Sequence, residues 1–167
     1  TVLEDTGTVS ATALYLLKTL TNDKRMAEYD IQMIPCCGHT LIANDDLTEV
    51  AISGCDTGTD WSTIHEGNSV RFILPTGQEE VVTLRKYQYE VLDFAKSVKR
   101  FYDACTPKEI PDDEFDRNGY TAFWNEWQRR YNNGLMLLSL ETGREMELSH
   151  DGLHYFVSHK DGDWSLY

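Results

Sequence analysis

The sequence predicts an α+β fold, and three features of its pattern lead to that prediction. Apolar and polar residues alternate through much of the first half of the chain, as they do in antiparallel strands. Two later segments repeat apolar residues at helical spacing. The end of the chain alternates again. We therefore expect residues 1–167 to form one domain, with a mainly antiparallel sheet, two main helices packed on it and a C-terminal β-meander.

The first expected element is a short amphipathic helix over residues 9–21. Its apolar residues recur at helical spacing, although alternate residues in the same stretch also fit a strand. Six strand-like runs then alternate with turn-forming Asn, Asp, Gly and Pro residues. These runs cover residues 29–34, 39–43, 49–53, 61–65, 70–74 and 80–84. Their short connections predict an antiparallel sheet built from hairpins.

A longer helix is expected over residues 86–104. Its apolar and aromatic residues form a stripe with a 3.6-residue period. Lys96, Lys99 and Arg100 lie on the opposite side near the C-terminal end, where the helix dipole favours cations. The stripe should face the sheet.

Pro107 and Pro111 end this helix and open an acidic loop from Glu109 to Asp116. A second helix is expected over residues 119–131, where aromatic residues form the apolar stripe. This stripe should face the sheet as well.

The last part of the chain, residues 132–167, predicts a four-strand meander beyond the main body of residues 1–131. Gly-containing turns separate its alternating runs. The runs cover residues 135–140, 144–148, 153–158 and 163–167. The meander either extends the first sheet or forms a small satellite.

The chain is strongly acidic. It carries 28 acidic and 15 basic residues, a net charge of −13. Residues 1–60 hold ten acids and three bases and residues 111–167 hold eleven and five, while the middle is balanced. Such a charge repels nucleic acid and anionic membranes and attracts basic proteins. We expect a basic protein partner.

A cytoplasmic protein is expected from two further observations. No stretch reaches the roughly 18 apolar residues of a membrane span, and no signal-peptide pattern is present. The four cysteines, Cys36, Cys37, Cys55 and Cys105, read as free thiols, because a domain of this size needs no disulfides.

Cys36, Cys37, His39 and Cys55 offer soft metal ligands, but their spacing argues against a metal site. A zinc knuckle needs about two residues between its cysteines, and neighbours on a strand point to opposite faces. Cys37 and His39 would share a face, yet no signature of a thiol enzyme surrounds them. We expect neither a metal nor a cofactor. His150, His154 and His159 flank turns and read as solvated residues.

No motif of a known enzyme class is present. The chain lacks a phosphate-binding glycine loop, a dinucleotide fingerprint and a serine elbow. The pair Asp45 and Asp46 lies in a polar loop, whereas acid–base catalysis by a carboxyl pair requires one of the two to be buried. These features favour a binding protein over an enzyme.

Two acidic loop regions carry aromatic residues and are the expected partner-binding surface. Exposed carboxylates steer a basic partner, and aromatic side chains anchor it. The acids could equally serve solubility alone. The first region contains Asp56, Asp60 and Trp61, and the second contains Asp112, Asp113, Glu114, Asp116 and Tyr120.

Several segments within residues 11–131 resemble immunity proteins of bacterial polymorphic-toxin systems. They are residues 34–39 (IPCCGH), 54–61 (GCDTGTDW), 64–67 (IHEG) and 115–127 (FDRNGYTAFWNEW). The resemblance implies a protein that neutralises a cognate toxin, such as a basic nuclease domain, by occluding it without catalysis. Immunity proteins are diverse, so the resemblance assigns no individual residue a role.

Three other functions fit the residues. A phage anti-defence protein acting as a DNA mimic would space its carboxylates like phosphates on one elongated face. A small thiol- or metal-dependent enzyme would centre on Cys37 and His39, and a scaffold module would have no special partner. Gene neighbourhood separates these functions. An adjacent toxin gene indicates an immunity protein, a phage operon indicates a DNA mimic, and a metabolic operon indicates an enzyme.

Overall fold

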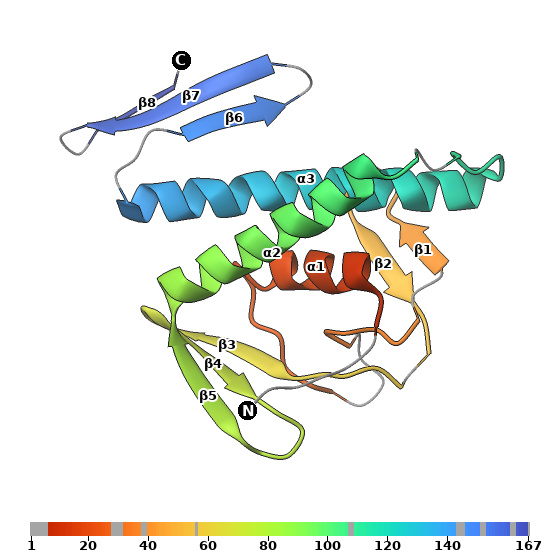
Figure 1. Cartoon of the computed structure of the whole chain (residues 1–167), viewed down its shortest axis with the longest axis horizontal. Helices are drawn as coiled ribbons and strands as arrows, with labels where there is room; N and C mark the ends of the chain where they lie inside the picture. The colour runs from red at the N-terminus through yellow and green to blue at the C-terminus, as the bar shows by residue number, and fades with distance from the viewer. Residues whose placement is uncertain are drawn as a thin grey trace.

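The computed structural model describes residues 7–27, 32–37, 40–55, 57–106, 109–142, 146–150, 153–160 and 163–166, with side chains between residues 7 and 139. Within these residues the chain forms three helices and short antiparallel sheets, so the predicted α+β class is confirmed. The helices lie side by side at the centre of the molecule (Figure 1).

The first helix, α1 (Val9–Lys18), is the most enclosed element, and the helix expected at residues 9–21 is confirmed. Buried residues occur all around it, which is typical of a helix surrounded by protein. Ala13 and Leu14 have no exposed surface. Because α1 contacts both of the other helices, it fills the centre of the core.

Within the described first half of the chain, the strands form two separate sheets rather than one. β1 pairs with β2, and β3, β4 and β5 form a three-stranded meander. Of the strand expected at residues 29–34, residues 29–31 lie outside the described ones, and Ile34 makes a single bridge with Thr59. The other five expected strands are confirmed as β1 (Thr40–Ala43), β2 (Val50–Ser53), β3 (Ser62–Glu66), β4 (Ser69–Ile73) and β5 (Glu79–Thr83).

The second helix, α2 (Leu84–Ala104), confirms the helix expected at residues 86–104. It begins directly after β5, where the Thr83 hydroxyl accepts a hydrogen bond from the Lys86 backbone N–H. Its stripe does not simply face the sheet. Val91 and Val98 are buried, but Phe101 near the C-terminal end is 65% exposed.

The third helix, α3 (Glu114–Thr142), is much longer than expected. It begins within the expected acidic loop of residues 109–116 and continues through residues 135–140, so the prediction of a strand at residues 135–140 is wrong. Leu135 and Leu138 pack against the core as helical residues. A short apolar run fits a buried helix as well as a strand. Gly134 does not end the helix, and it lies against the side-chain ends of Leu20 and Leu92.

Beyond α3 the described residues form the strands β6 (Met146–His150), β7 (Leu153–Lys160) and β8 (Asp163–Leu166). They pair in sequence order as an antiparallel sheet, which lies beside α3 in Figure 1. The side chains of His150, His154 and His159 lie outside the described ones.

One charged residue lies fully inside the core. The Glu126 side chain has no exposed surface and accepts hydrogen bonds from the Val50 backbone N–H (2.8 Å) and Arg130 Nε (2.7 Å). Lys18 Nζ lies 3.2 Å from the same carboxylate. Glu126 on α3 thereby links α1 and β2 to its own helix. In the described part of the chain, no helix has both the length and the apolar surface for crossing a membrane.

Candidate functional site

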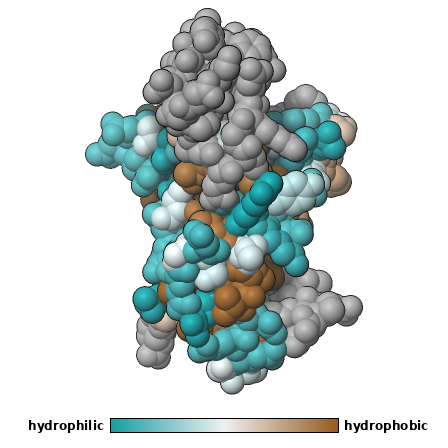
Figure 2. Space-filling view, turned by 90° about the vertical axis from the view of Figure 1, so that its left-hand side faces the viewer, coloured by the Kyte–Doolittle hydropathy of each residue, from teal (hydrophilic) through white to brown (hydrophobic). Residues whose placement is uncertain are grey.

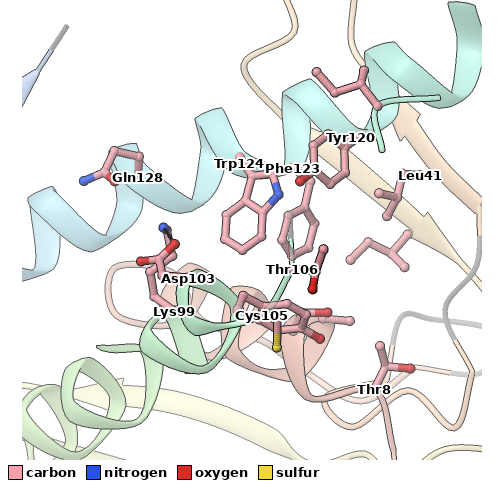
Figure 3. A pocket seen from close by; sticks show the side chains of 15 residues that line it. Thr8, Leu41, Lys99, Asp103, Cys105, Thr106, Tyr120, Phe123, Trp124 and Gln128 are labelled. Atoms are coloured by element: carbon pink, nitrogen blue, oxygen red, sulfur yellow. Dashed lines mark hydrogen bonds and ion pairs between the residues drawn. The ribbon is translucent and has the colours of Figure 1, made fainter. Parts of the chain in front are cut away.

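A groove with a volume of about 730 Å³ opens between α1, the β1–β2 hairpin, the end of α2 and the first half of α3. Most of its wall is apolar or aromatic. Figure 3 shows Tyr120, Phe123 and Trp124 of α3 on one side of the groove. On the other side lie Lys99 and Asp103 of α2, and Cys105, which directly follows this helix. Tyr102, Leu41 and Ile52 complete the apolar part of the wall.

Trp124 is the centre of the aromatic cluster. The ring centroids of Phe123, Tyr102 and Tyr120 lie 5.2, 6.1 and 6.4 Å from that of Trp124, all in edge-to-face arrangements. Lys99 Nζ lies 5.3 Å from the Trp124 ring centroid, and Asp103 pairs with the same ammonium. The groove therefore already holds one cation over an aromatic face, the geometry of a cation–π contact.

Large apolar side chains are exposed around this groove. Ile110, which is part of the groove wall, is 64% exposed, and Phe101, whose ring packs edge-to-face on that of Tyr102, is 65% exposed. Exposed apolar side chains that gather at a groove are typical of interaction sites in soluble proteins.

The second predicted group of acids lies at the entrance to α3. Asp112, Asp113, Glu114 and Asp116 are all exposed, and they lie in the chain between Ile110 and Tyr120, both of which line the groove. Asp113 also caps the helix: its carboxylate accepts a hydrogen bond from the Asp116 backbone N–H (3.1 Å). The acids of this group are therefore close to the groove in the chain, but they do not belong to its wall.

The first predicted group is placed differently. The Asp60 carboxylate accepts hydrogen bonds from Lys24 Nζ at 2.6 and 2.7 Å and from the Met33 backbone N–H at 3.1 Å, so it holds the fold together. Trp61 lines a second hollow, of about 470 Å³, together with Phe72 and Phe94. Asp56 lies outside the described residues. The structure therefore does not bring Asp60 and Trp61 into the groove beside Trp124.

Hydrophobic surface also reaches the side of the molecule where α2 begins. Figure 2 shows this side, on which hydrophobic residues form a band bordered by hydrophilic ones. The second hollow has a mostly apolar wall but includes the carboxylates of Glu80 and Glu90.

Three thiols form a separate cluster. The sulfur atoms of Cys36, Cys37 and Cys55 all lie within 4.8 Å of one another, and Cys37 Sγ is 2.8 Å from Cys55 Sγ. The expectation that the adjacent cysteines point to opposite faces is wrong, because Cys36 lies in a bend and not in a strand. His39 lies outside the described residues.

The two closest thiols have pKa values shifted in opposite directions. Hydrogen bonds from Cys37 and from Thr57 to the Cys55 sulfur lower the pKa of Cys55 to about 6. The hydrogen bond that Cys37 donates to the Cys55 sulfur raises the pKa of Cys37. One thiolate, that of Cys55, therefore forms near neutral pH while Cys37 keeps its proton.

Alkylation of Cys55 by iodoacetamide should follow this low pKa. In the folded protein the rate should rise with pH around a midpoint of about 6, because the thiolate is the nucleophile. In urea the midpoint should move up toward the ordinary value of a thiol, since unfolding removes the hydrogen bonds. Peptide mass spectrometry of the labelled protein measures both profiles. Identical profiles would show that the cluster does not perturb Cys55.

The aromatic groove was not predicted as a site. Its helical residues, such as Tyr102, Phe123 and Trp124, were assigned to stripes facing the sheet. The available signal was the high number of aromatic residues in the two helices, because Tyr and Trp have a polar atom and are enriched at interfaces. Leu41 and Ile52 gave no such signal, since their place in the wall depends on how α3 crosses the hairpin.

Comparison of the chain with protein-family models, curated proteins and solved structures finds no match. The class of the protein therefore follows from its own fold and surface. It is an α+β protein with an open aromatic groove, an exposed acidic segment in the chain between two residues of the groove wall, and a separate thiol cluster.

Proposed function

We propose that the protein is an immunity-type inhibitor that binds a basic toxin domain in the cytoplasm and neutralises it by occlusion, without catalysis. The aromatic groove carries the proposal, together with the exposed acidic segment that lies in the chain between Ile110 and Tyr120 of its wall. A basic segment of the toxin would enter the groove and lose access to its own substrate.

The wall of the groove has the composition of a protein interface. Aromatic residues contribute most to binding energy when they lie at the centre of an interface and are surrounded by residues that exclude water. Trp124 and Tyr120 are half-buried in the groove, while Ile110 provides an exposed apolar edge. A partner that covered Ile110 would exclude water from the aromatic cluster.

The charge at the edge selects a basic partner. The segment of residues 112–116 contains four exposed acids, and the first cation after it, Arg117, donates a hydrogen bond from Nη1 to the Asp112 carbonyl. The net charge of −13 adds a long-range attraction to the same kind of partner. Association should therefore be fast at low salt and slow down as the salt concentration rises.

Two substitutions in the groove test the charge of the occupant. Trp124→Ala should weaken binding of the cognate toxin domain that the proposal requires about tenfold, because it removes the central ring. Lys99→Gln should tighten binding about threefold, because it removes the cation that lies over that ring and repels a basic segment. Surface plasmon resonance at several salt concentrations measures both effects.

Asp60→Asn serves as the matched control, since Asp60 is committed to Lys24 and lies outside the groove. It should leave the association rate nearly unchanged once its folding has been verified by circular dichroism. If Lys99→Gln weakened binding, the occupant would not be basic. If the adjacent toxin killed cells equally with and without this protein, the immunity function would be wrong.

A further inference from the structure

We propose that Cys36, Cys37 and Cys55 form a zinc-binding site. All three sulfur atoms lie within 4.8 Å of one another, although Cys55 is far from the other two in sequence. The site is separate from the aromatic groove, and the inference does not rest on the proposed function.

The backbone around the cluster holds the two cysteine segments together. Ile34 and Thr59 exchange a pair of backbone hydrogen bonds at 2.9 and 3.0 Å. Next to this bridge, the Gln32 side chain accepts a hydrogen bond from the Gly58 N–H at 2.7 Å. The segment before Cys36 is thus fixed against the segment that follows Cys55.

Close approach of the two segments depends on Gly58. A Cβ atom at this position would collide with the Ile34 carbonyl oxygen and lie 3.0 Å from the Cys36 backbone nitrogen. Because the scaffold is built for this approach, the thiols do not depend on the metal to meet. Such preorganisation lowers the cost of binding an ion.

The cluster also supplies hydrogen bonds that suit thiolates. The Cys55 backbone N–H donates to Cys37 Sγ at 3.3 Å, and the Thr57 hydroxyl lies 3.2 Å from Cys55 Sγ. Partners of this kind stabilise the charge on metal-bound sulfur and orient it.

The geometry fits zinc after a small adjustment. A tetrahedral zinc ion with Zn–S bonds of about 2.3 Å holds its sulfur ligands about 3.8 Å apart. The Cys37 and Cys55 sulfurs, 2.8 Å apart, would separate by about 1 Å through side-chain rotation. Each bound thiol releases its proton to solvent. A water molecule or another side chain would complete the coordination shell.

Zinc explains the cluster better than a disulfide does. A Cys37–Cys55 disulfide would use two of the three thiols and would need an oxidant, such as a peroxide, to accept two electrons. Zinc uses all three thiols and needs no electron acceptor. Among common divalent ions, thiolate sulfur favours zinc over calcium or magnesium.

Metal titration of the full-length reduced protein tests the site. We expect one zinc ion per chain by elemental analysis after dialysis, and cobalt(II) should produce the intense near-ultraviolet band of sulfur-to-cobalt charge transfer. Cys36→Ser and Cys55→Ser should each lower zinc affinity by at least about tenfold. Cys105→Ser is the matched control, because this exposed thiol lines the groove and lies outside the cluster.

The cobalt band and the loss of affinity in both cluster variants, with Cys105→Ser unchanged, would establish the site. The proposal would be overturned if the reduced protein took up no metal, or if Cys105→Ser lost as much affinity as the cluster variants. Formation of a Cys37–Cys55 disulfide in air, without zinc uptake by the reduced protein, would also overturn it. Circular dichroism of each variant shows whether loss of binding reflects loss of fold.

Discussion

Replacement of Glu126 by alanine is expected to lower the free energy of unfolding by about 3 kcal/mol, because it leaves buried polar groups without their partner. The carboxylate has no exposed surface and joins Lys18, Val50 and Arg130. Its removal leaves the Val50 N–H of β2 without its acceptor and takes the closer of two ion-pair partners from the mostly buried Arg130 guanidinium. Urea unfolding followed by tryptophan fluorescence measures the loss.

Glu49→Ala is the matched control for this substitution. Glu49 also pairs with Arg130, at 3.8 Å, and with Arg129, at 3.1 Å, but its side chain is 57% exposed. Removal of an exposed ion-pair partner should cost less than about 1 kcal/mol. Glu126→Gln should fall between the two, because its amide oxygen still accepts from Val50. Equal losses for Glu126→Ala and Glu49→Ala would show that burial does not strengthen this network.

Glu126 also shows what the sequence pattern does not reveal. The helix around it was predicted from its aromatic residues, and a glutamate within such a helix is expected to face solvent. Its burial depends on the backbone N–H of Val50, which lies 76 residues earlier in the chain. Periodicity describes one helix at a time, so it cannot show that a polar residue finds its partners on a distant strand.

Helices and hairpin turns could be predicted because they depend on residues close together in the chain. The contact between Glu126 and Val50 could not, because these residues are far apart in the chain. The hairpin between β3 and β4 turns at Gly67, which has a φ of 60°, and the next turn has Gly77 at 79°. Glycine adopts these angles without strain, so short-range sequence determines both turns. By contrast, α3 continues through residues 132–134, which separate the helix expected at residues 119–131 from the strand expected at residues 135–140, and it packs Leu135 and Leu138 against the core.

The candidate sites also differ in how far their residues lie apart in the chain, and this decides how well each could be predicted. The acids at residues 112–116 are exposed and are neighbours in the chain of Ile110 and Tyr120, two residues of the groove wall. The meeting of Cys36 and Cys37 with Cys55 depends on the bridge between Ile34 and Thr59, a long-range contact that no motif encodes. Spacing rules for metal sites assume local ligands, and they therefore missed this cluster.

Gly119→Ala is expected to destabilise the protein by about 1–2 kcal/mol, although alanine is the better helix former. Gly119 lies where α3 crosses β1. A Cβ atom added there would collide with the Leu41 backbone carbonyl oxygen and lie 2.7 Å from Leu41 Cβ. Because Leu41 is held in the strand by its pairing with Ile52, the backbone of either element must shift. Urea unfolding measures the loss.

Gly134→Ala provides the comparison within the same helix. The nearest atoms to a Cβ at Gly134 are the side-chain ends of Leu20 and Leu92, at 2.7 and 2.8 Å, and these can rotate away. Its destabilisation should therefore be smaller than that of Gly119→Ala, since helix propensity offsets part of the strain. If Gly134→Ala lowered the free energy of unfolding more than Gly119→Ala, the contact of Gly119 with Leu41 of β1 would not be the more rigid one. Because Leu41 and Tyr120 both line the groove, Gly119→Ala should also weaken toxin binding, whereas Gly134→Ala should leave it unchanged.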